Sequence, residues 1–168
     1  MQIRQATPED VEQLIAMHTR LEEHFKAANP DFWLPTPADV AGWADNYQRW
    51  IAEDDAVFLV AQDSVELAGF AVGEVLEREG GTPAVVGSIR LTYVRENRRG
   101  QGIGTALVER LLAFFESRGV QEVTTGYVVG NAEAERFWTG LGFHSIIITA
   151  DAPARALRER IRDRQGDR

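Results

Sequence analysis

The stretch "RRGQGIGTAL", from Arg98 to Leu107, places three glycines within five residues, directly before an apolar helical pattern. Glycine weakens a helix by about 0.5–1 kcal/mol relative to alanine, so this cluster needs a physical reason. At a helix start the first N–H groups lack partners, and glycines allow a bulky anion to come close. The pattern therefore predicts a backbone site for a diphosphate, to which Arg98 or Arg99 adds a charged contact. A tight strand-to-helix turn is the alternative, and it explains one glycine better than three.

Two better-known phosphate-binding patterns do not fit this stretch. A Walker A loop needs Gly-Lys followed by Ser or Thr, and the stretch contains no lysine. The Rossmann pattern fails because Thr105 and Leu107 stand where its last glycine would be required. What remains is Arg99-x-x-Gly102-x-Gly104, between a predicted strand and a predicted amphipathic helix.

The elements around this stretch are predicted from the period of the apolar residues. Helical spacing begins after Thr7, which is typical of an N-cap, and again from about Thr36. Further helices are predicted directly after the glycines, over residues 131–142 and over residues 151–168. The predicted strands are residues 3–6, 56–63, 68–77, 84–94, 121–129 and 143–149.

The resulting order is β-α-α-β-β-β-α-β-α-β with a C-terminal helix. Short links between adjacent strands imply antiparallel pairing, and the strand–helix–strand after residue 84 implies one parallel neighbour. We therefore predict an α/β (α+β) fold with a mixed, mostly antiparallel central sheet flanked by helices. A doubly wound dinucleotide fold is excluded, because strand and helix do not alternate from the start. The length of 168 residues predicts a single domain over residues 1–168.

Composition excludes several classes of site. The chain has no cysteine, which excludes disulfides, thiolate metal sites and a thiol nucleophile. The N-terminus has no apolar signal-peptide core and no apolar run could span a bilayer, so a soluble cytoplasmic protein without a membrane partner is expected. His18 and His144 lie in apolar patterns typical of core histidines, and no spacing indicates a metal site.

Charge is distributed unevenly along the chain. Residues 1–80 hold 5 basic and 16 acidic side chains, residues 81–168 hold 13 and 10, and the net charge is −8. The first half should repel nucleic acid and attract cations, whereas the second half tolerates an anionic ligand. A nucleic-acid partner is therefore disfavoured, because such binding needs a basic footprint. The alternative is an acidic surface that only keeps the protein soluble.

Two blocks of the sequence resemble a known family. The segment "LTYVRENRRGQGIGTALVERLLAFFESRG" resembles the central motif of the GNAT superfamily of acetyl-CoA-dependent N-acetyltransferases, in which (Arg or Gln)-x-x-Gly-x-(Gly or Ala) opens a helix after a strand. The segment "NAEAERFWTGLGF", Asn131 to Phe143, resembles the family's downstream motif, with Asn-x-x-Ala, an aromatic pair and Leu-Gly-Phe. Together they make residues 84–149 the expected acyl-CoA-binding core. Residues 1–55 resemble the family only in element order and would form the acceptor side.

The resemblance implies roles for residues on the donor side. In the family the backbone of the glycine-rich stretch holds the coenzyme's diphosphate, and the strand before it pairs with the pantetheine arm. Main-chain groups of Val94 and Tyr93 would make that pairing, and a nearby backbone N–H would polarise the thioester carbonyl. Asn131 would contact the pantetheine side and also cap the next helix. The residues implied to hold the diphosphate are Arg99, Gly100, Gln101, Gly102, Ile103, Gly104 and Thr105.

The sequence departs from the family where a tyrosine often protonates the departing thiolate. Trp138 occupies that position, and an indole N–H donates a hydrogen bond without being a practical proton source at neutral pH. Trp138 is therefore expected to contact the coenzyme. Either another group donates the proton, or the thiolate leaves stabilised by water and hydrogen bonds, or the chemistry is impaired. Tyr127, on the predicted strand before Asn131, is the candidate acid, with a core-facing aromatic as the alternative. Tyr93 is a weaker candidate.

The general base is also left open by the family pattern. Members often use a glutamate on the central strand, and this chain has Ser88 at that position. Glu74, between apolar residues on the neighbouring predicted strand, is the candidate base, with a solvated strand glutamate as the alternative. Glu22, Glu23 and His24 end the first predicted helix, near the predicted acceptor side, and form either a solvated turn or a cation site.

The resemblance implies an acyl-CoA-dependent N-acyltransferase. An acetyl group would pass from acetyl-CoA to a primary amine, expected to be cationic, by direct attack in a ternary complex and without a metal. The acceptor would be a small-molecule or peptide amine, and a homodimer is expected. The alternative is a catalytically impaired coenzyme-A-binding sensor or structural module. Aromatic residues of the first half would line the acceptor side or pack in the helix core: Trp33, Trp43, Tyr47 and Trp50.

Overall fold

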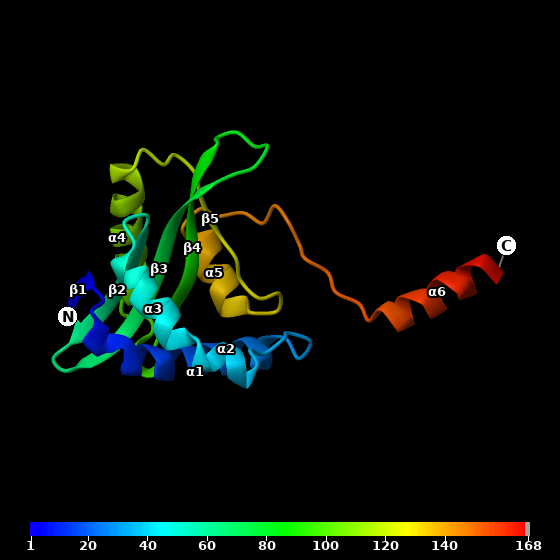
Figure 1. Ribbon diagram of the computed structural model, residues 1–168, viewed down its shortest axis with the longest axis horizontal. Coiled ribbons are helices and arrows are strands. Elements are labelled where there is room, and N and C mark those ends of the chain that lie inside the picture. Colours follow the sequence, from blue (N-terminus) through cyan, green and yellow to red (C-terminus); the bar gives the residue numbers. More distant parts are fainter. Residues whose placement is uncertain (167–168) are drawn as a thin grey trace. The chain divides into compact units, whose positions relative to one another are not determined.

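The computed structural model describes residues 1–166, in two compact units, Met1–Ala132 and Glu133–Arg168. The first unit holds one five-stranded sheet with helices on both faces, and the second is mainly helical (Figure 1). The prediction of a single domain over residues 1–168 stays a prediction.

The sheet of the first unit runs in the order β1-β2-β3-β4-β5. Neighbouring strands from β1 to β4 pair antiparallel, and β5 pairs parallel to β4. This confirms the mixed, mostly antiparallel sheet and the parallel neighbour after the glycine-rich helix. The strands are β1 (Gln2–Gln5), β2 (Ala56–Asp63), β3 (Glu66–Glu77), β4 (Val85–Val94) and β5 (Val123–Thr125).

The helices of the first unit follow the predicted order, but the second predicted helix is divided. Thr36 begins it, and its side chain accepts a hydrogen bond from the N–H of Asp39. Gly42 then separates two helical segments. The helices are the 3-10 turn η1 (Pro8–Asp10), α1 (Val11–Ala28), α2 (Pro37–Ala41), α3 (Trp43–Ala52), the 3-10 turn η2 (Glu96–Arg98) and α4 (Ile103–Ser117).

One face of the sheet packs against α1 and α3. An aromatic row crosses it from helix to sheet, with ring centroids 5.2 Å apart for Tyr47 and Phe58, 5.8 Å for Phe58 and Phe70, and 6.0 Å for Phe70 and Tyr93. Removing such a buried aromatic side chain costs about 3–5 kcal/mol. Burial raises the pKa of Tyr47 far above its usual range. The row fixes α3 against the middle of the sheet.

The helix core also holds the aromatic and histidine side chains for which packing was an expected role. Trp43 and His18 are buried and stack with ring centroids 4.0 Å apart. Nδ1 of His18 hydrogen-bonds the hydroxyl of Tyr47, and Trp50 packs against the same cluster. The core role predicted for His18 is therefore confirmed. Trp33 differs, because it is 65% exposed.

The other face of the sheet packs against α4, and two glycines allow the close approach. A Cβ placed on Gly73 would lie 2.9 Å from the ring of Phe115. A Cβ placed on Gly87 would lie 2.8 Å from the same ring. Because contacts this short are too close for carbon atoms, Phe115 can lie flat on the sheet only where these strands lack side chains.

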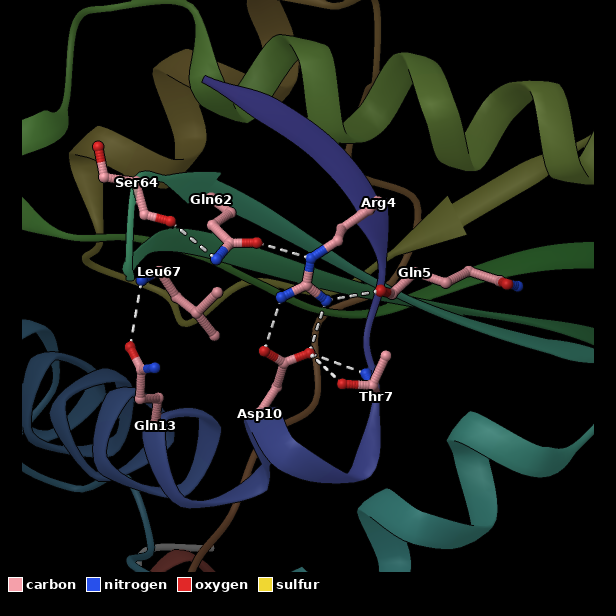
Figure 2. A network of polar contacts seen from close by, with 8 residues as sticks. All are labelled: Arg4, Gln5, Thr7, Asp10, Gln13, Gln62, Ser64 and Leu67. Atoms are coloured by element: carbon pink, nitrogen blue, oxygen red, sulfur yellow. Dashed lines mark hydrogen bonds and ion pairs between the residues drawn. The ribbon is translucent and has the colours of Figure 1, made fainter.

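A polar network braces the turn between β2 and β3 (Figure 2). Arg4 donates to both carboxylate oxygens of Asp10, at 2.7 and 2.8 Å, and its Nε donates to Gln62 at 2.8 Å. Gln62 in turn donates to the carbonyl of Ser64 at 2.9 Å. The hydrogen bond from Arg4 holds the pKa of Asp10 below its usual range. The network joins β1, the start of α1 and the β2–β3 turn.

The second unit corrects one predicted strand. Its helices are α5 (Ala132–Gly140), which begins at the last residue of the first unit, and α6 (Ala154–Gly166). Residues 143–149, predicted as a strand, have no regular secondary structure. A strand needs a neighbouring strand for its hydrogen bonds, and the described part of this unit contains none. His144, expected in the core, is exposed.

Candidate functional site

The glycine-rich stretch links the end of β4 to the start of α4. Gly100 and Gly102 have φ angles of 71° and 78°, in the left-handed region that favours glycine. A Cβ added at either position would meet no atom within 4 Å. Conformation, and not crowding, therefore requires these two glycines, and the open space beside them leaves room for a ligand to approach the backbone.

The first turn of α4 presents backbone N–H donors beside these glycines. Gly102 is the N-cap, and the first helical hydrogen bond runs from the N–H of Ala106 to its carbonyl at 3.0 Å. The N–H groups of Ile103, Gly104 and Thr105 therefore precede the helical ladder. The first turn contains no acidic side chain. This helix start has the geometry and charge that favour an anion.

The structure separates the two arginines that the sequence left as alternatives. Arg98 donates to the carboxylate of Asp63, at the end of β2, at 2.7 Å, and this contact holds the pKa of Asp63 below its usual range. Nε of Arg98 also lies 3.4 Å from Oε1 of Gln101. Arg99 instead donates from Nε to the carbonyl of Val94 at 3.1 Å. Arg98 therefore fastens the glycine-rich stretch to the braced β2–β3 turn, and Arg99 bridges the strand end and the glycines.

The second half of β4 has an open edge. Pairing with β5 ends at Ile89 and Thr125, so no strand of the described residues pairs with residues 90–94 on that side. The N–H of Arg95 donates to Ala68 on β3, and main-chain groups alternate along a strand. Those of Val94 and Thr92 therefore face the open edge. We call residues 90–94 the open edge below.

Two further features mark the open edge. Arg90 is skipped in the β3–β4 backbone register, because Val72 pairs with Leu91 and Gly73 pairs with Ile89, so β4 carries a bulge there. The hydroxyl of Thr92 is buried and has no hydrogen-bond partner among the described residues. An orphaned buried hydroxyl is uncommon and is compatible with a missing ligand group.

Tyr93 takes a different orientation from Val94. Its carbonyl lies beside β3, where a Cβ on Gly69 would be only 2.7 Å away. Its main chain therefore does not face the open edge, and its side chain lies on the face covered by α1 and α3. The main-chain contact with a coenzyme predicted for both residues remains untested, and the geometry favours Val94.

A pocket of about 510 Å³ lies between the second half of α1 and the end of β4. This size is within the range of small-molecule sites, about 300–1,000 Å³. Its lining includes Arg20, Glu23 and His24 from α1, and Tyr93, Arg95 and Glu96 from the strand end and the turn after it. Glu23, His24 and Tyr93 are candidate site residues from the sequence, whereas Arg20, Arg95 and Glu96 are found only from the structure.

Charged groups surround the Tyr93 phenol in this pocket. Burial raises the pKa of Tyr93, the guanidinium groups of Arg99, Arg95 and Arg20 oppose that rise, and Glu96 adds to it. Charges of both signs therefore act on the same hydroxyl. Arg20 and Glu23 also form an ion pair at 2.8 Å at the pocket mouth.

Glu74, the candidate base, stands directly opposite Ser88 in the β3–β4 register. Ser88 on β4 occupies the position where family members often have a glutamate. In this chain a carboxylate at the same level of the sheet comes from Glu74 on the neighbouring strand β3. Its side chain is 18% exposed, and Nε of Arg90 lies 3.5 Å from Oε2. Glu74 is not part of the pocket lining. Its catalytic role remains a prediction.

Tyr127 and Asn131 lie after β5 in the first unit. β5 ends at Thr125, so Tyr127 is not on a strand as predicted but in the irregular segment that follows it. Tyr127 is half-buried, and Asn131 is buried directly before α5. Their predicted contacts with the coenzyme and the departing thiolate are untested.

Trp138 has a structural role within the second unit. The N–H of Phe143 donates to the carbonyl of Trp138 at 3.0 Å, and the N–H of Gly142 donates to Thr139 at 3.0 Å. Gly142 has a φ of 94°, and the rings of Trp138 and Phe143 meet edge to face at 5.2 Å. This is a Schellman motif with its hydrophobic contact, and it explains "FWTGLGF" as a helix end. The predicted coenzyme contact of Trp138 remains untested.

The described residues contain no group of three or more His, Asp or Glu side chains placed to hold a metal ion. None of the helices in these residues is long and apolar enough to cross a membrane.

Comparisons with known proteins agree with this geometry. Residues 18–143 match the Acetyltransferase (GNAT) family. An L-methionine sulfoximine/L-methionine sulfone acetyltransferase from Pseudomonas aeruginosa is 32% identical over 116 residues, which cover 66% of this chain and 63% of the relative. The chain therefore spans less than two thirds of that relative.

Two other proteins extend the comparison. An aminoglycoside N(6')-acetyltransferase type 1 from Stenotrophomonas maltophilia is 29% identical over 136 residues, covering 70% of this chain and 88% of the relative. A solved structure described as a predicted acetyltransferase with acetyl-CoA, from Clostridium acetobutylicum, has a TM-score of 0.73 and 15% identity. The superposition covers 90% of this chain and 95% of that one, and it shows the same fold.

Proposed function

Because the chain belongs to the Acetyltransferase (GNAT) family, we propose that it transfers an acetyl group from acetyl-CoA to the primary amine of a small molecule. The observation that carries the donor half is the pair of left-handed glycines beside an open strand edge. The relatives named for methionine sulfoximine and for aminoglycosides both act on small-molecule amines, which supports the acceptor half.

The donor site fits a long molecule with a diphosphate at one end and amides along its arm. The N–H groups at the start of α4 and the Arg99 guanidinium suit the diphosphate. The main-chain groups of Val94 suit an amide of the pantetheine arm, because they lie on the open edge. Acetyl-CoA supplies the activated thioester, and the N–H of Thr92 faces the edge where its carbonyl would be polarised.

The transfer is a direct displacement in a ternary complex. The neutral amine nitrogen forms a bond to the thioester carbon, and the carbon–sulfur bond breaks to release the coenzyme thiolate. The amine must first lose a proton, for which Glu74 is the proposed acceptor. The thiolate gains a proton, for which Tyr127 is the proposed donor. Substituting Tyr127 by Phe should therefore lower turnover without weakening acetyl-CoA binding.

The pocket beside Tyr93 is the proposed acceptor site. It adjoins β4 on the face covered by α1, and Glu23 and Glu96 can attract the ammonium form of an amine. We expect the protein to be cytoplasmic and homodimeric, and size-exclusion chromatography with light scattering tests the second expectation.

The experiment that tests the proposed function measures thiol release from acetyl-CoA across a panel of primary amines, with mass spectrometry of the products. Release coupled to N-acetylated products is expected. The rival function is a coenzyme-A-binding module without catalysis, which the missing family tyrosine at Trp138 favours. Acetyl-CoA binding without thiol release across the whole panel would establish that rival.

A further inference from the structure

Arg95 is held rigidly at the edge of the acceptor pocket. Its main-chain N–H donates to Ala68 at 2.9 Å, and its Nε donates to the carbonyl of Leu67 at 2.6 Å. Both contacts are to the backbone of β3, so the guanidinium is fixed relative to the sheet. A guanidinium held in place loses little further freedom when it binds a ligand.

This guanidinium has unused hydrogen-bonding capacity. Among the residues that the structure describes, no ion pair joins Arg95 to a carboxylate. Its Nε is engaged by Leu67, but the two terminal nitrogens carry four more N–H donors in a planar fork that suits a carboxylate. A half-buried arginine without an acidic partner, lining a pocket, is a natural anchor for an anionic group of a ligand.

Groups that suit an ammonium lie directly beside this anchor. Glu96 follows Arg95 in the chain and also lines the pocket. Its negative charge raises the pKa of the Tyr93 phenol, whereas the positive charge of Arg95 lowers it. Arg20 and Glu23 repeat the pairing of charges at the pocket mouth. The pocket is thus neutral in sum but divided into cationic and anionic points, although residues 1–80 are strongly acidic.

We propose that this pocket selects acceptors that carry a carboxylate beside the amine, as an α-amino acid does, with Arg95 holding the carboxylate. The proposal rests on the proposed acetyl transfer and specifies its substrate class. Tyr93 lines the pocket and directly follows Thr92 on β4, so an acceptor anchored at Arg95 has its amine near the strand where the thioester is expected. A polycation without a carboxylate would form no ion pair with Arg95, and the guanidinium groups of Arg95 and Arg20 would repel it.

The test compares α-amino acids with their α-amides, which keep the shape and the amine but lose the negative charge. Thiol release is measured at saturating acetyl-CoA for the whole chain, and the amino acids are expected to have a kcat/KM at least about ten-fold higher than their amides. In Arg95→Gln the ratio of kcat/KM for amino acids to kcat/KM for amides should fall to about one. The kcat/KM for the amino acids should fall about ten-fold, and that for the amides should not change.

Arg20→Gln provides a second variant that keeps the proposal falsifiable if Arg95→Gln folds poorly. Arg20 is at the mouth and 72% exposed, so its loss should weaken amino-acid acceptors by a smaller factor and leave folding intact. Arg49→Gln is the matched control, because Arg49 forms a similar exposed helical pair with Glu53 outside the pocket lining. This control should keep the wild-type preference.

The outcomes separate the two proposals. If diamines or amides are acetylated as well as amino acids, or if Arg95→Gln raises the KM for acetyl-CoA and leaves amino-acid preference unchanged, the carboxylate anchor is wrong while acetyl transfer stands. If no primary amine releases thiol although acetyl-CoA binds, the proposed function fails and the substrate class fails with it.

Discussion

The donor side and the acceptor pocket proposed for this molecule would recognise their ligands in different ways. The proposed donor side consists of the open edge, the two left-handed glycines and the start of α4, and the groups it offers a ligand are mainly backbone groups. The acceptor pocket consists of side chains that α1 and the end of β4 bring together from more than sixty positions apart in the chain. A backbone site tolerates many side chains around it, whereas a side-chain pocket can change its ligand through one substitution.

The largest effect is expected from disrupting the donor backbone. Gly102→Val places a β-branched residue at a φ of 78°, which strains the turn and moves the first donors of α4. We expect acetyl-CoA affinity to fall by about 100-fold or more, measured by isothermal titration calorimetry.

Gly119→Val is the matched control for that variant. Gly119 has a φ of 70° at the other end of α4, and a Cβ there also meets nothing within 4 Å. It should cost similar stability while acetyl-CoA affinity is retained. Equal loss of affinity in both variants would mean that Gly102 acts only through the fold.

Chemistry between the two sides depends on the proposed proton acceptor. Glu74→Gln keeps the size of the side chain and removes its charge, so kcat should fall by about 100-fold if the carboxylate takes the amine proton. KM for both substrates should change little, and stopped-flow thiol detection measures the difference. Glu77→Gln, on the exposed end of the same strand, is the control. An unchanged kcat would assign the base elsewhere, with His24 of the pocket as the next candidate.

A smaller effect on the donor side should follow from loosening the glycine-rich stretch. Asp63→Asn removes the charged partner of Arg98. The KM for acetyl-CoA should rise several-fold, which corresponds to the free energy of one partly exposed ion pair, and kcat should not change. A truncated donor, S-acetylpantetheine, has no diphosphate and should show no change.

Asp55→Asn is the control for that substitution, because Asp55 is 86% exposed and 3.9 Å from Arg118. If Asp63→Asn affects both donors equally, the contact with Arg98 supports the fold in general and does not position the diphosphate site.

The smallest effect on activity is expected in the network that braces the β2–β3 turn. The pKa of Asp10 is lowered in the folded state, so its contribution to stability is present above the unfolded pKa of about 3.9. That contribution is lost as the pH falls through the lower folded pKa. Asp10→Asn should reduce the free energy of unfolding at pH 7 by about 1–3 kcal/mol and remove this acid dependence. Urea unfolding at pH 7 and pH 3 measures both, and an unchanged acid slope would show that other carboxylates cause it.

Much of the fold was predictable because local sequence patterns determine it. The periods of the apolar residues gave β2, β3 and β4 close to their observed bounds, and the glycines marked the start of α4. The strand predicted over residues 143–149 was wrong, although three isoleucines favour a strand. Strand formation depends on a partner strand, and sequence periodicity does not report whether one is available.

The candidate site also has one part that the sequence predicts and another that only the tertiary structure shows. The sequence by itself determined the conformation of the glycine-rich stretch, because only glycine adopts the left-handed conformations at Gly100 and Gly102 without strain. Only the tertiary structure decided that Arg98 pairs with Asp63, that Glu74 stands opposite Ser88, and that Arg95 lines a pocket with residues of α1. Backbone conformation is a property of neighbouring residues and is visible in a short motif. Pairing between side chains depends on how distant segments pack, which the order of residues along the chain does not show.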